Sequence, residues 1–351
     1  MPFDRRSCSI FVIETWTGQP FSRQRMSQSQ TESWVRIKVE PAELKELMRR
    51  QDARPLRDFA LYFLLLAGLA CLTTALWGHW SAAIALFAYS TLYSTGAQSR
   101  EHETGHGTAF RTKWLNRLFF EITSFMAVRE TFLRTHSHDA HHKHTIIVER
   151  DPEIVTPAPP RIAELVMNIF MITRTLKELR HIVIHSCGGL SAQDRERGRT
   201  ALPEGAAAKA RLWLVVMAAT AGLALYLGSW LPVLLLGPVL TMIGGPIKQL
   251  FAVSQHVGLA RDVFDYRLNT RTIHLGPVLG FLYMNMQYHL EHHLYPNVPY
   301  YNLPRLHELI RDRCPPAYDG LWAVYAELIP VLWRQRRDPS VFIRREIPAA
   351  G

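Results

Sequence analysis

Three short segments of the chain contain histidines at the spacing of successive helical turns. The segments read HETGH at residues 102–106, HDAHH at residues 138–142 and HLEHH at residues 289–293. Their histidines are His102, His106, His138, His141, His142, His289, His292 and His293. Residues three and four positions apart share one face of a helix, so the rings of each segment can converge on one point. Imidazole is the commonest metal ligand among side chains, and three such clusters predict a metal site.

Two long segments without charged residues indicate that the chain crosses a membrane. Residues 59–99 and 212–247 contain no Asp, Glu, Lys or Arg, and each is twice as long as the ~20 apolar residues that span a bilayer. Each segment is interrupted near its middle, at residues 78–80 and 228–232. We therefore expect transmembrane helices at roughly residues 59–77, 81–98, 212–228 and 232–251.

The predicted fold class is an all-α integral membrane protein, with four transmembrane helices in two hairpins and a cytoplasmic helical cap that holds the metal site. Trp77, Trp80 and Trp230 lie at the two hairpin tips, and amphipathic rings are stable at a membrane interface. A soluble protein with two buried core hairpins is the alternative. Soluble core helices rarely stay uncharged all round over such lengths, which argues against it.

The distribution of basic residues predicts the orientation in the membrane. All 40 Lys and Arg residues lie outside the two uncharged segments, and the hairpin tips have none. The positive-inside rule therefore places both termini and the 100–211 connection in the cytoplasm. We expect a bacterial inner membrane rather than the endoplasmic reticulum. The net charge of +10 reflects this topology, and the chain has no base-reading helix or stacking motif that would indicate nucleic acid.

This topology places the three histidine segments on the cytoplasmic side, together with His256 just after the fourth predicted helix. Nine imidazoles exceed the four ligands of a tetrahedral zinc ion. They suit two metal ions of higher coordination, with open positions for oxygen or water. Imidazole binds Zn, Cu, Fe and Ni, so the ligand type alone leaves the metal open. The four cysteines are far apart and form no C-x-x-C pair, which argues against a zinc ribbon or a redox pair.

The motifs resemble the three histidine boxes of membrane fatty acid desaturases and of their hydroxylase and ketolase relatives. Those boxes have the forms H-x3/4-H, H-x2/3-HH and H/Q-x2/3-HH, and HETGH, HDAHH and HLEHH match them in this order around two apolar hairpins. His256 matches a further histidine after the fourth helix. The resemblance covers roughly residues 55–310.

The resemblance implies a non-haem site of two iron ions that uses O2 to remove hydrogen from an unactivated C–H bond. The implied metal ligands are His102, His106, His138, His141, His142, His256, His289, His292 and His293. We expect O2-dependent desaturation of an aliphatic, fatty acyl substrate at the cytoplasmic face of the membrane. Because the product depends on small differences in substrate placement, a hydroxylase or ketolase acting on a lipid or carotenoid remains the alternative. A non-catalytic membrane protein with a His-lined metal site, or a zinc hydrolase, fits the ligand count less well.

Four polar residues near the boxes are candidates for orienting the ligands: Glu103, Asp139, Asn285 and Glu291. Many relatives carry an Asn four residues before the histidine that follows the fourth helix, where this chain has Ala252. Asn285, four residues before His289, is a candidate replacement, and a helix-capping role suits it equally well. For each carboxylate, a solvated position on a helix is at least as good an interpretation.

We divide the chain into an N-terminal cytoplasmic segment, partly disordered (1–54), a membrane and di-metal catalytic domain (55–310) and a C-terminal cytoplasmic tail (311–351). Segment 276–287, GPVLGFLYMNMQ, and the membrane helices are expected to wall an apolar substrate tunnel. The chain has no haem-binding H-P-G-G and no cysteine cluster, so a separate electron donor of ferredoxin or cytochrome b5 type must dock. Basic residues on the cytoplasmic face can steer an acidic donor: Arg261, Arg267 and Arg271.

Overall fold

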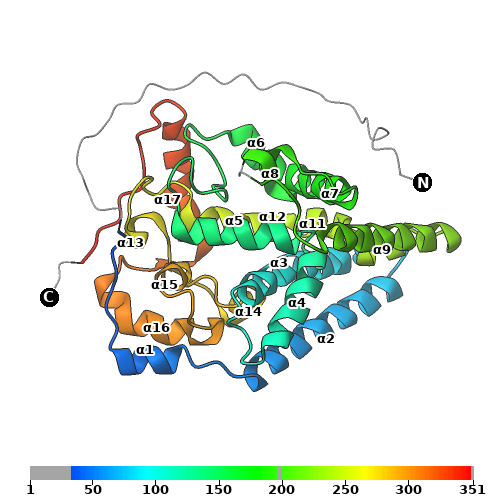
Figure 1. Ribbon diagram of the computed structural model, residues 1–351, viewed down its shortest axis with the longest axis horizontal. Helices are drawn as coiled ribbons and strands as arrows, with labels where there is room; N and C mark the ends of the chain where they lie inside the picture. The colour runs from blue at the N-terminus through cyan, green and yellow to red at the C-terminus, as the bar shows by residue number, and fades with distance from the viewer. Residues whose placement is uncertain (1–32, 197–198, 349–351) are drawn as a thin grey trace. The chain divides into compact units, whose positions relative to one another are not determined.

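The computed structural model describes residues 33–196 and 199–348, which are mostly helical (Figure 1). The disorder expected near the N-terminus concerns residues that lie largely outside this described part. Residues from Trp34 onward form one compact unit. The elements in chain order are α1 (Pro41–Leu47), α2 (Ala53–Ala75), α3 (Ser81–Gly105), α4 (Lys113–Met126), α5 (Thr131–Lys143), α6 (Ile162–Met167), the 3-10 turn η1 (Asn168–Phe170), α7 (Ile172–Ser186), α8 (Ala192–Glu196), α9 (Ala206–Tyr226), α10 (Leu231–Leu236), α11 (Val239–Ile243), α12 (Gly245–His256), α13 (Tyr266–Asn269), β1 (Ile273–His274), α14 (Pro277–Leu282), α15 (His289–Leu294), η2 (Tyr300–Asn302), α16 (Leu303–Ile310), η3 (Arg311–Arg313), β2 (Tyr318–Asp319) and α17 (Gly320–Gln335).

The first predicted hairpin is present as α2 and α3, which pack against each other. Gly78 closes the turn between them with a φ of +91°, a conformation that favours glycine. Gly96 allows close packing of the pair, since an added Cβ would lie 2.6 Å from the Tyr62 ring. Helix α3 continues past the predicted end at residue 98 to Gly105, so the first histidine segment is a direct extension of this hairpin.

The second predicted hairpin differs from the expectation on its returning side. Helix α9 is continuous, but the expected helix at 232–251 is divided into α10, α11 and α12. The breaks fall at Gly237-Pro238 and Gly244-Gly245-Pro246, where proline removes a helical hydrogen bond and clashes with the preceding turn. Gly244 meets α3 so closely that an added Cβ would lie 2.0 Å from the Ser90 carbonyl oxygen. The prediction of one continuous fourth helix is therefore wrong.

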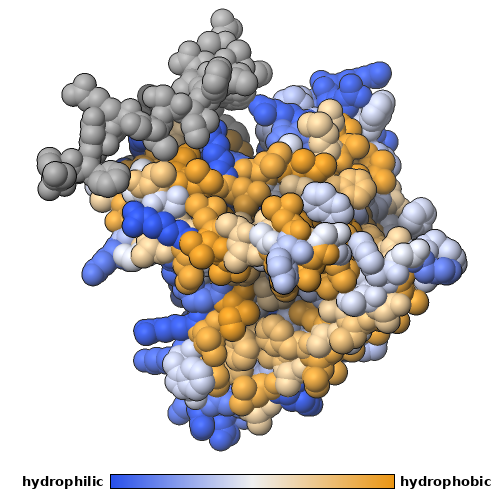
Figure 2. Space-filling view, turned by 90° about the vertical axis from the view of Figure 1, so that its right-hand side faces the viewer, coloured by the Kyte–Doolittle hydropathy of each residue, from blue (hydrophilic) through white to orange (hydrophobic). Residues whose placement is uncertain are grey.

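Two helices in the described part of the chain, α2 and α9, are long and apolar enough to cross a membrane. Both leave most of their apolar side chains exposed, as at Leu64 and Leu225. Figure 2 shows that hydrophobic side chains cover much of the surface at the end of the molecule where α9 lies. Helix α4 also exposes Trp114 and Leu118 one turn apart, and α17 exposes Trp322. These faces suit contact with lipid.

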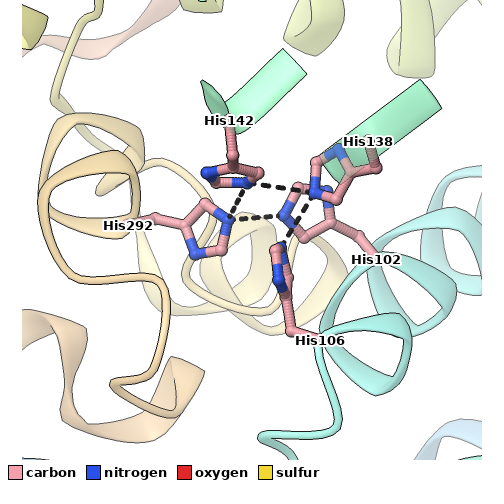
Figure 3. A group of neighbouring side chains, drawn as sticks. All are labelled: His102, His106, His138, His142 and His292. Atoms are coloured by element: carbon pink, nitrogen blue, oxygen red, sulfur yellow. Dashed lines mark hydrogen bonds between the residues drawn. The ribbon is translucent and has the colours of Figure 1, made fainter. Parts of the chain in front are cut away.

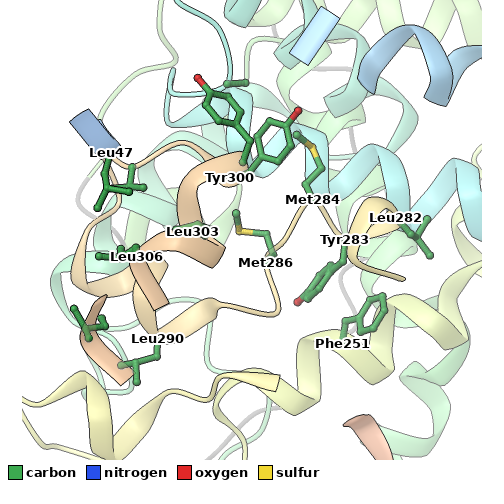
Figure 4. Close-up of a cluster of buried hydrophobic side chains, with 14 of the residues drawn as sticks. Leu47, Phe251, Leu282, Tyr283, Met284, Met286, Leu290, Tyr300, Leu303 and Leu306 are labelled. Atoms are coloured by element: carbon green, nitrogen blue, oxygen red, sulfur yellow. The ribbon is translucent and has the colours of Figure 1, made fainter. Parts of the chain in front are cut away.

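A large apolar core holds the C-terminal half of the chain around α15. Leu290 of α15 packs with Leu303 and Leu306 of α16 and with Leu47 of α1, all of them buried (Figure 4). The strands β1 and β2 form a short parallel pair in which Ile273 lies opposite Tyr318. Helix α15 carries the third histidine segment, so this core determines where its imidazoles lie.

Candidate metal centre

Five histidines from three helices form a first histidine group (Figure 3). They are His102 of α3, His106 directly after the end of α3, His138 and His142 of α5, and His292 of α15. Their Nε2 atoms face one another. The Nε2 atoms of His102 and His292 are 2.8 Å apart, and those of His106 and His138 are also 2.8 Å apart. The Nε2 atom of His142 lies 3.1 Å from that of His138 and 3.2 Å from that of His292.

Four buried histidines form a second histidine group beside the first. They are His141 of α5, His256 of α12, and His289 and His293 of α15. The Nε2 atom of His289 lies 3.0 Å from that of His256 and 3.1 Å from that of His293. The rings of His142 and His293, one from each group, stack with centroids 4.4 Å apart, so the two groups are adjacent.

The second and third segments each contribute to both groups, which corrects the expectation that the rings of one segment meet at one point. In α5 the i, i+4 pair His138 and His142 enters the first group, and His141 enters the second. In α15 the pair His289 and His293 enters the second group, and His292 enters the first. A helix completes one turn in 3.6 residues, so a step of three residues falls short of a full turn and a step of four exceeds it. The middle histidine therefore points to one side of the first histidine, and the last histidine points to the other side.

Burial favours the neutral form of eight of these imidazoles. It lowers their pKa, and positive charge on neighbouring groups lowers it further. The pKa falls to about 3 for His106 and for His256. Neutral imidazole is the form that binds a metal ion.

Acceptors behind the rings place the proton on the outer nitrogen. The Nδ1 atom of His141 lies 2.8 Å from an oxygen of Asp151, and that of His138 lies 3.3 Å from Glu153. The Nδ1 atom of His256 lies 2.9 Å from a backbone carbonyl oxygen. A ring that donates through Nδ1 leaves the lone pair of Nε2 pointing inward. At His102 the Nδ1 atom instead faces an arginine, Arg134, at 3.2 Å, so metal binding there displaces a proton.

The spacing of the inner nitrogens fits metal ions. Two nitrogens bound at right angles to one ion, each at about 2.1 Å, lie about 3.0 Å apart. Six pairs of neighbouring Nε2 atoms within the two groups are 2.8 to 3.2 Å apart, and the ligand atoms of each group all lie within 4.8 Å of one another. Several inward lone pairs at this distance repel each other unless a cation or a proton lies between them. The donor set therefore fits one metal ion in each group.

Family membership follows once this geometry is compared with known proteins. Residues 75–325 match the family described as Fatty acid desaturase. The chain belongs to the fatty acid desaturase family. Members of that family are membrane-bound di-iron oxidoreductases with histidine boxes, so the chain is an enzyme of this kind. No curated protein matches the chain closely enough to add a relative.

The four residues that we expected to orient the desaturase ligands have other partners or face solvent. Glu103 accepts hydrogen bonds from Thr108 and from the backbone N–H of Tyr300, and burial raises its pKa to about 7. Asp139 is exposed on α5. Glu291 accepts from Thr272 and from His307.

Asn285 lies before the start of α15, with a φ of +54°. The helical alignment that we assumed between it and His289 is therefore absent. Its amide donates to the Tyr300 carbonyl. The position of Ala252, by contrast, lines the cavity next to the histidine groups.

Asp151 and Glu153 are the carboxylates that contact desaturase-box histidines, and sequence reasoning missed them. They lie within Asp-Pro-Glu, residues 151–153, shortly after the second histidine segment. Two carboxylates so close to HDAHH were the available signal. Thr145, three residues after the second histidine segment, also contacts His293: its hydroxyl oxygen lies 3.1 Å from Nδ1.

A buried histidine outside both groups anchors the N-terminal end of α5. His185 of α7 bonds through Nδ1 to Glu130, the residue that precedes α5, and through Nε2 to Asp194 of α8 at 2.9 Å. Burial opposes a charge on this ring, but the hydrogen bonds to the two carboxylates outweigh it and raise the pKa of His185 above its ordinary value. The His185 ring thus links α7 and α8 to the start of α5, the helix that carries the second box.

A cavity of about 440 Å³ opens onto the metal centre between α3, α5, α7 and α12. Five of the nine desaturase histidines line it: His102, His138, His141, His256 and His289. Segment 276–287, expected to wall an apolar tunnel, contributes Tyr283 and Met286 to this cavity. Most of the remaining lining is polar or charged, which differs from the expected apolar walls.

Proposed function

We propose that this member of the desaturase family holds two iron ions and uses O2 to introduce a double bond into an aliphatic, fatty acyl substrate. The proposed ligands of one ion are His102, His106, His138, His142 and His292, and those of the other are His141, His256, His289 and His293. The observation that carries the proposal is the convergence of these nine imidazoles, most of them buried, into two adjacent groups.

Iron bound in both groups supplies the activation of O2 and the removal of hydrogen from carbon. Desaturation of one C–C bond consumes O2, two electrons and two protons, and it releases two molecules of water. The side chains prepare the site for this chemistry. Asp151 and Glu153 hold two box rings with their inner lone pairs free. Burial of the rings keeps competing water away from the ligands.

Hydroxylation or ketone formation makes the same demands on the ligands and remains the alternative. The two outcomes differ in the product, which loses two hydrogens in one case and gains oxygen in the other. Mass analysis of the product after incubation with labelled O2 separates them.

We also propose a multi-pass topology with both termini and the metal centre in the cytoplasm, in a bacterial inner membrane. The exposed apolar surfaces of α2 and α9 support it, and α3 with α10–α12 would complete the membrane part. Electrons would come from a separate ferredoxin or cytochrome of b5 type. Arg271 cannot help such a donor to dock, because its side chain is 1% exposed and donates to the Ser254 carbonyl.

Metal analysis of the purified protein tests the proposed function. We expect close to two irons per chain by plasma mass spectrometry, with iron lost in His292→Ala. The matched control is His274→Ala, because His274 is exposed on β1 and belongs to neither histidine group. A single zinc per chain, or equal metal content in His292→Ala and the control, would contradict the di-iron proposal.

A further inference from the structure

A lysine without a partner lies in the cavity that opens onto the metal centre. Lys248 of α12 is 4% exposed and lines this cavity. Among the described residues, no carboxylate lies within ion-pair distance of its ammonium group and no acceptor bonds to it. Keeping an amine charged in such a buried position costs several kcal/mol unless an opposite charge lies beside it. An anion bound in the cavity would therefore stabilise the ammonium form of Lys248.

Lys248 lies on the same face of α12 as a metal-group histidine. Lys248, Ala252 and His256 follow each other at i, i+4 and i+8, and all three line the cavity. Eight residues of helix span about 12 Å. A molecule held by Lys248 can thus extend along α12 and reach the histidines with a part that lies several bonds away.

The other charged groups of the cavity leave a positive excess. Glu153 and Arg134 neutralise each other at 2.5 Å. Glu130 bonds to His185, Arg129 pairs with Glu101, and Glu164 pairs with Arg161. After these pairs, the cations without an ion pair in the described structure outnumber the carboxylates: Lys248, Arg174 and Lys177 against Glu178.

We propose that this cavity binds a small aliphatic substrate by a free carboxylate at Lys248, with the carbon chain directed along α12 toward the histidine groups. Of these three cations only Lys248 is buried, and its one ammonium group matches the single charge of a carboxylate better than the double charge of a phosphate. A thioester or ester carbonyl has no charge to offer, so the inference favours a free acid over an acyl chain on a carrier. The inference rests on the proposed function for the reaction of the bound substrate, but not for its binding.

Ligand binding to the full-length protein in nanodiscs of neutral lipid tests the inference. The probes are octanoate, octanamide, octylamine and octyl phosphate, and the readout is isothermal titration calorimetry. We expect octanoate to bind best. Charge-assisted hydrogen bonds contribute about 1.5–3 kcal/mol, so Lys248→Met should weaken octanoate binding by about tenfold or more. Lys248→Arg restores the charge and should restore most of the affinity. The control is Lys45→Met, because Lys45 is exposed on α1, and it should bind like the unchanged protein.

The outcomes separate this inference from the proposed function. Equal octanoate binding by Lys248→Met and Lys45→Met would overturn the inference. This includes the case in which octanoate binds to iron without help from Lys248. A preference of the unchanged protein for octanamide or octylamine would also overturn it, as would a preference for octyl phosphate. The comparison of probes on the unchanged protein stands even if Lys248→Met fails to fold. Iron content is measured separately, so two irons without carboxylate binding would leave the proposed function intact.

Discussion

Replacing Asp151 with Asn should weaken the second histidine group more than the first. The Oδ2 atom of Asp151 accepts from Nδ1 of His141 and from the backbone N–H of Ile146, each at 2.8 Å. Its Oδ1 atom accepts from the backbone N–H of Glu153, also at 2.8 Å. An amide has one oxygen for these three donors. With that oxygen toward His141, the new NH2 group faces the Glu153 N–H and leaves it unsatisfied.

The geometry sets the expected magnitude. A buried donor without an acceptor costs about 1–3 kcal/mol of stability. A neutral amide also orients His141 less firmly than a carboxylate does, and loss of such a partner lowers metal affinity by about 10–100-fold. That loss corresponds to about 1.4–2.8 kcal/mol of binding free energy. Both effects act on the ring that belongs to the second histidine group.

Iron retention against a graded chelator measures this effect. In Asp151→Asn we expect one of two irons to leave at about 10–100-fold lower chelator than in the unchanged protein, and the other to leave near the usual concentration. The control is Asp139→Asn, a substitution of the same type at an exposed position of α5, which should retain both irons. Equal retention of both irons in Asp151→Asn would refute the reasoning. Simultaneous loss of both would show that Asp151 supports the whole site through folding.

Three further changes have expected results. His185→Gln should lower the melting temperature most at acidic pH. The raised pKa of His185 contributes stability that is fully present below about pH 6.5, the unfolded value, and is lost as the pH rises through the folded value. An equal effect at pH 6 and pH 9 would contradict this. The lowered pKa values of seven box histidines and of His256 act oppositely. Acid below pH 6.5 should therefore release iron and reduce stability as the unfolded chain takes up protons; iron retained unchanged at pH 4.5 would contradict it. Gly244→Ala should reduce the stability of the fold by about 3 kcal/mol or more, because its Cβ would clash with the Ser90 carbonyl. Gly222→Ala, in open space on α9, should raise the stability by about 0.5–1 kcal/mol. Similar melting temperatures for the two variants would contradict this.

Helical spacing pointed to eight of the nine histidines that the structure brings together, because a ligand must lie on the correct face of its own helix, whereas His256 followed from its place after the fourth predicted helix and from the family resemblance. It could not assign them to groups, since that depends on how α3, α5, α12 and α15 cross in space. The same limit hid Asp151 and Glu153. Their role depends on a loop that returns to α5, and residue spacing describes only positions within one helix.

The uncharged segments predicted α2 and α9 well, because composition alone decides whether a helix can lie in lipid. The break before α12 was visible as Gly244-Gly245-Pro246 but was outweighed by the apolar run. Apolar composition says nothing about backbone continuity, whereas proline and a close approach to Ser90 interrupt it. The expectation that Arg271 helps an electron donor to dock failed because a charged residue was assumed to be exposed. Backbone carbonyls can accept hydrogen bonds from a buried guanidinium, as the Ser254 carbonyl does here.

The division of the second and third boxes between both groups has a consequence for the distance between two metal ions bound there. His141 and His142 are neighbours on α5 and belong to different groups, as do His292 and His293 on α15. The offset between neighbouring residues of a helix is fixed at 1.5 Å of rise and about 100° of rotation. Because α5 and α15 each supply ligands to both groups, their backbone geometry would define the separation of two ions bound there.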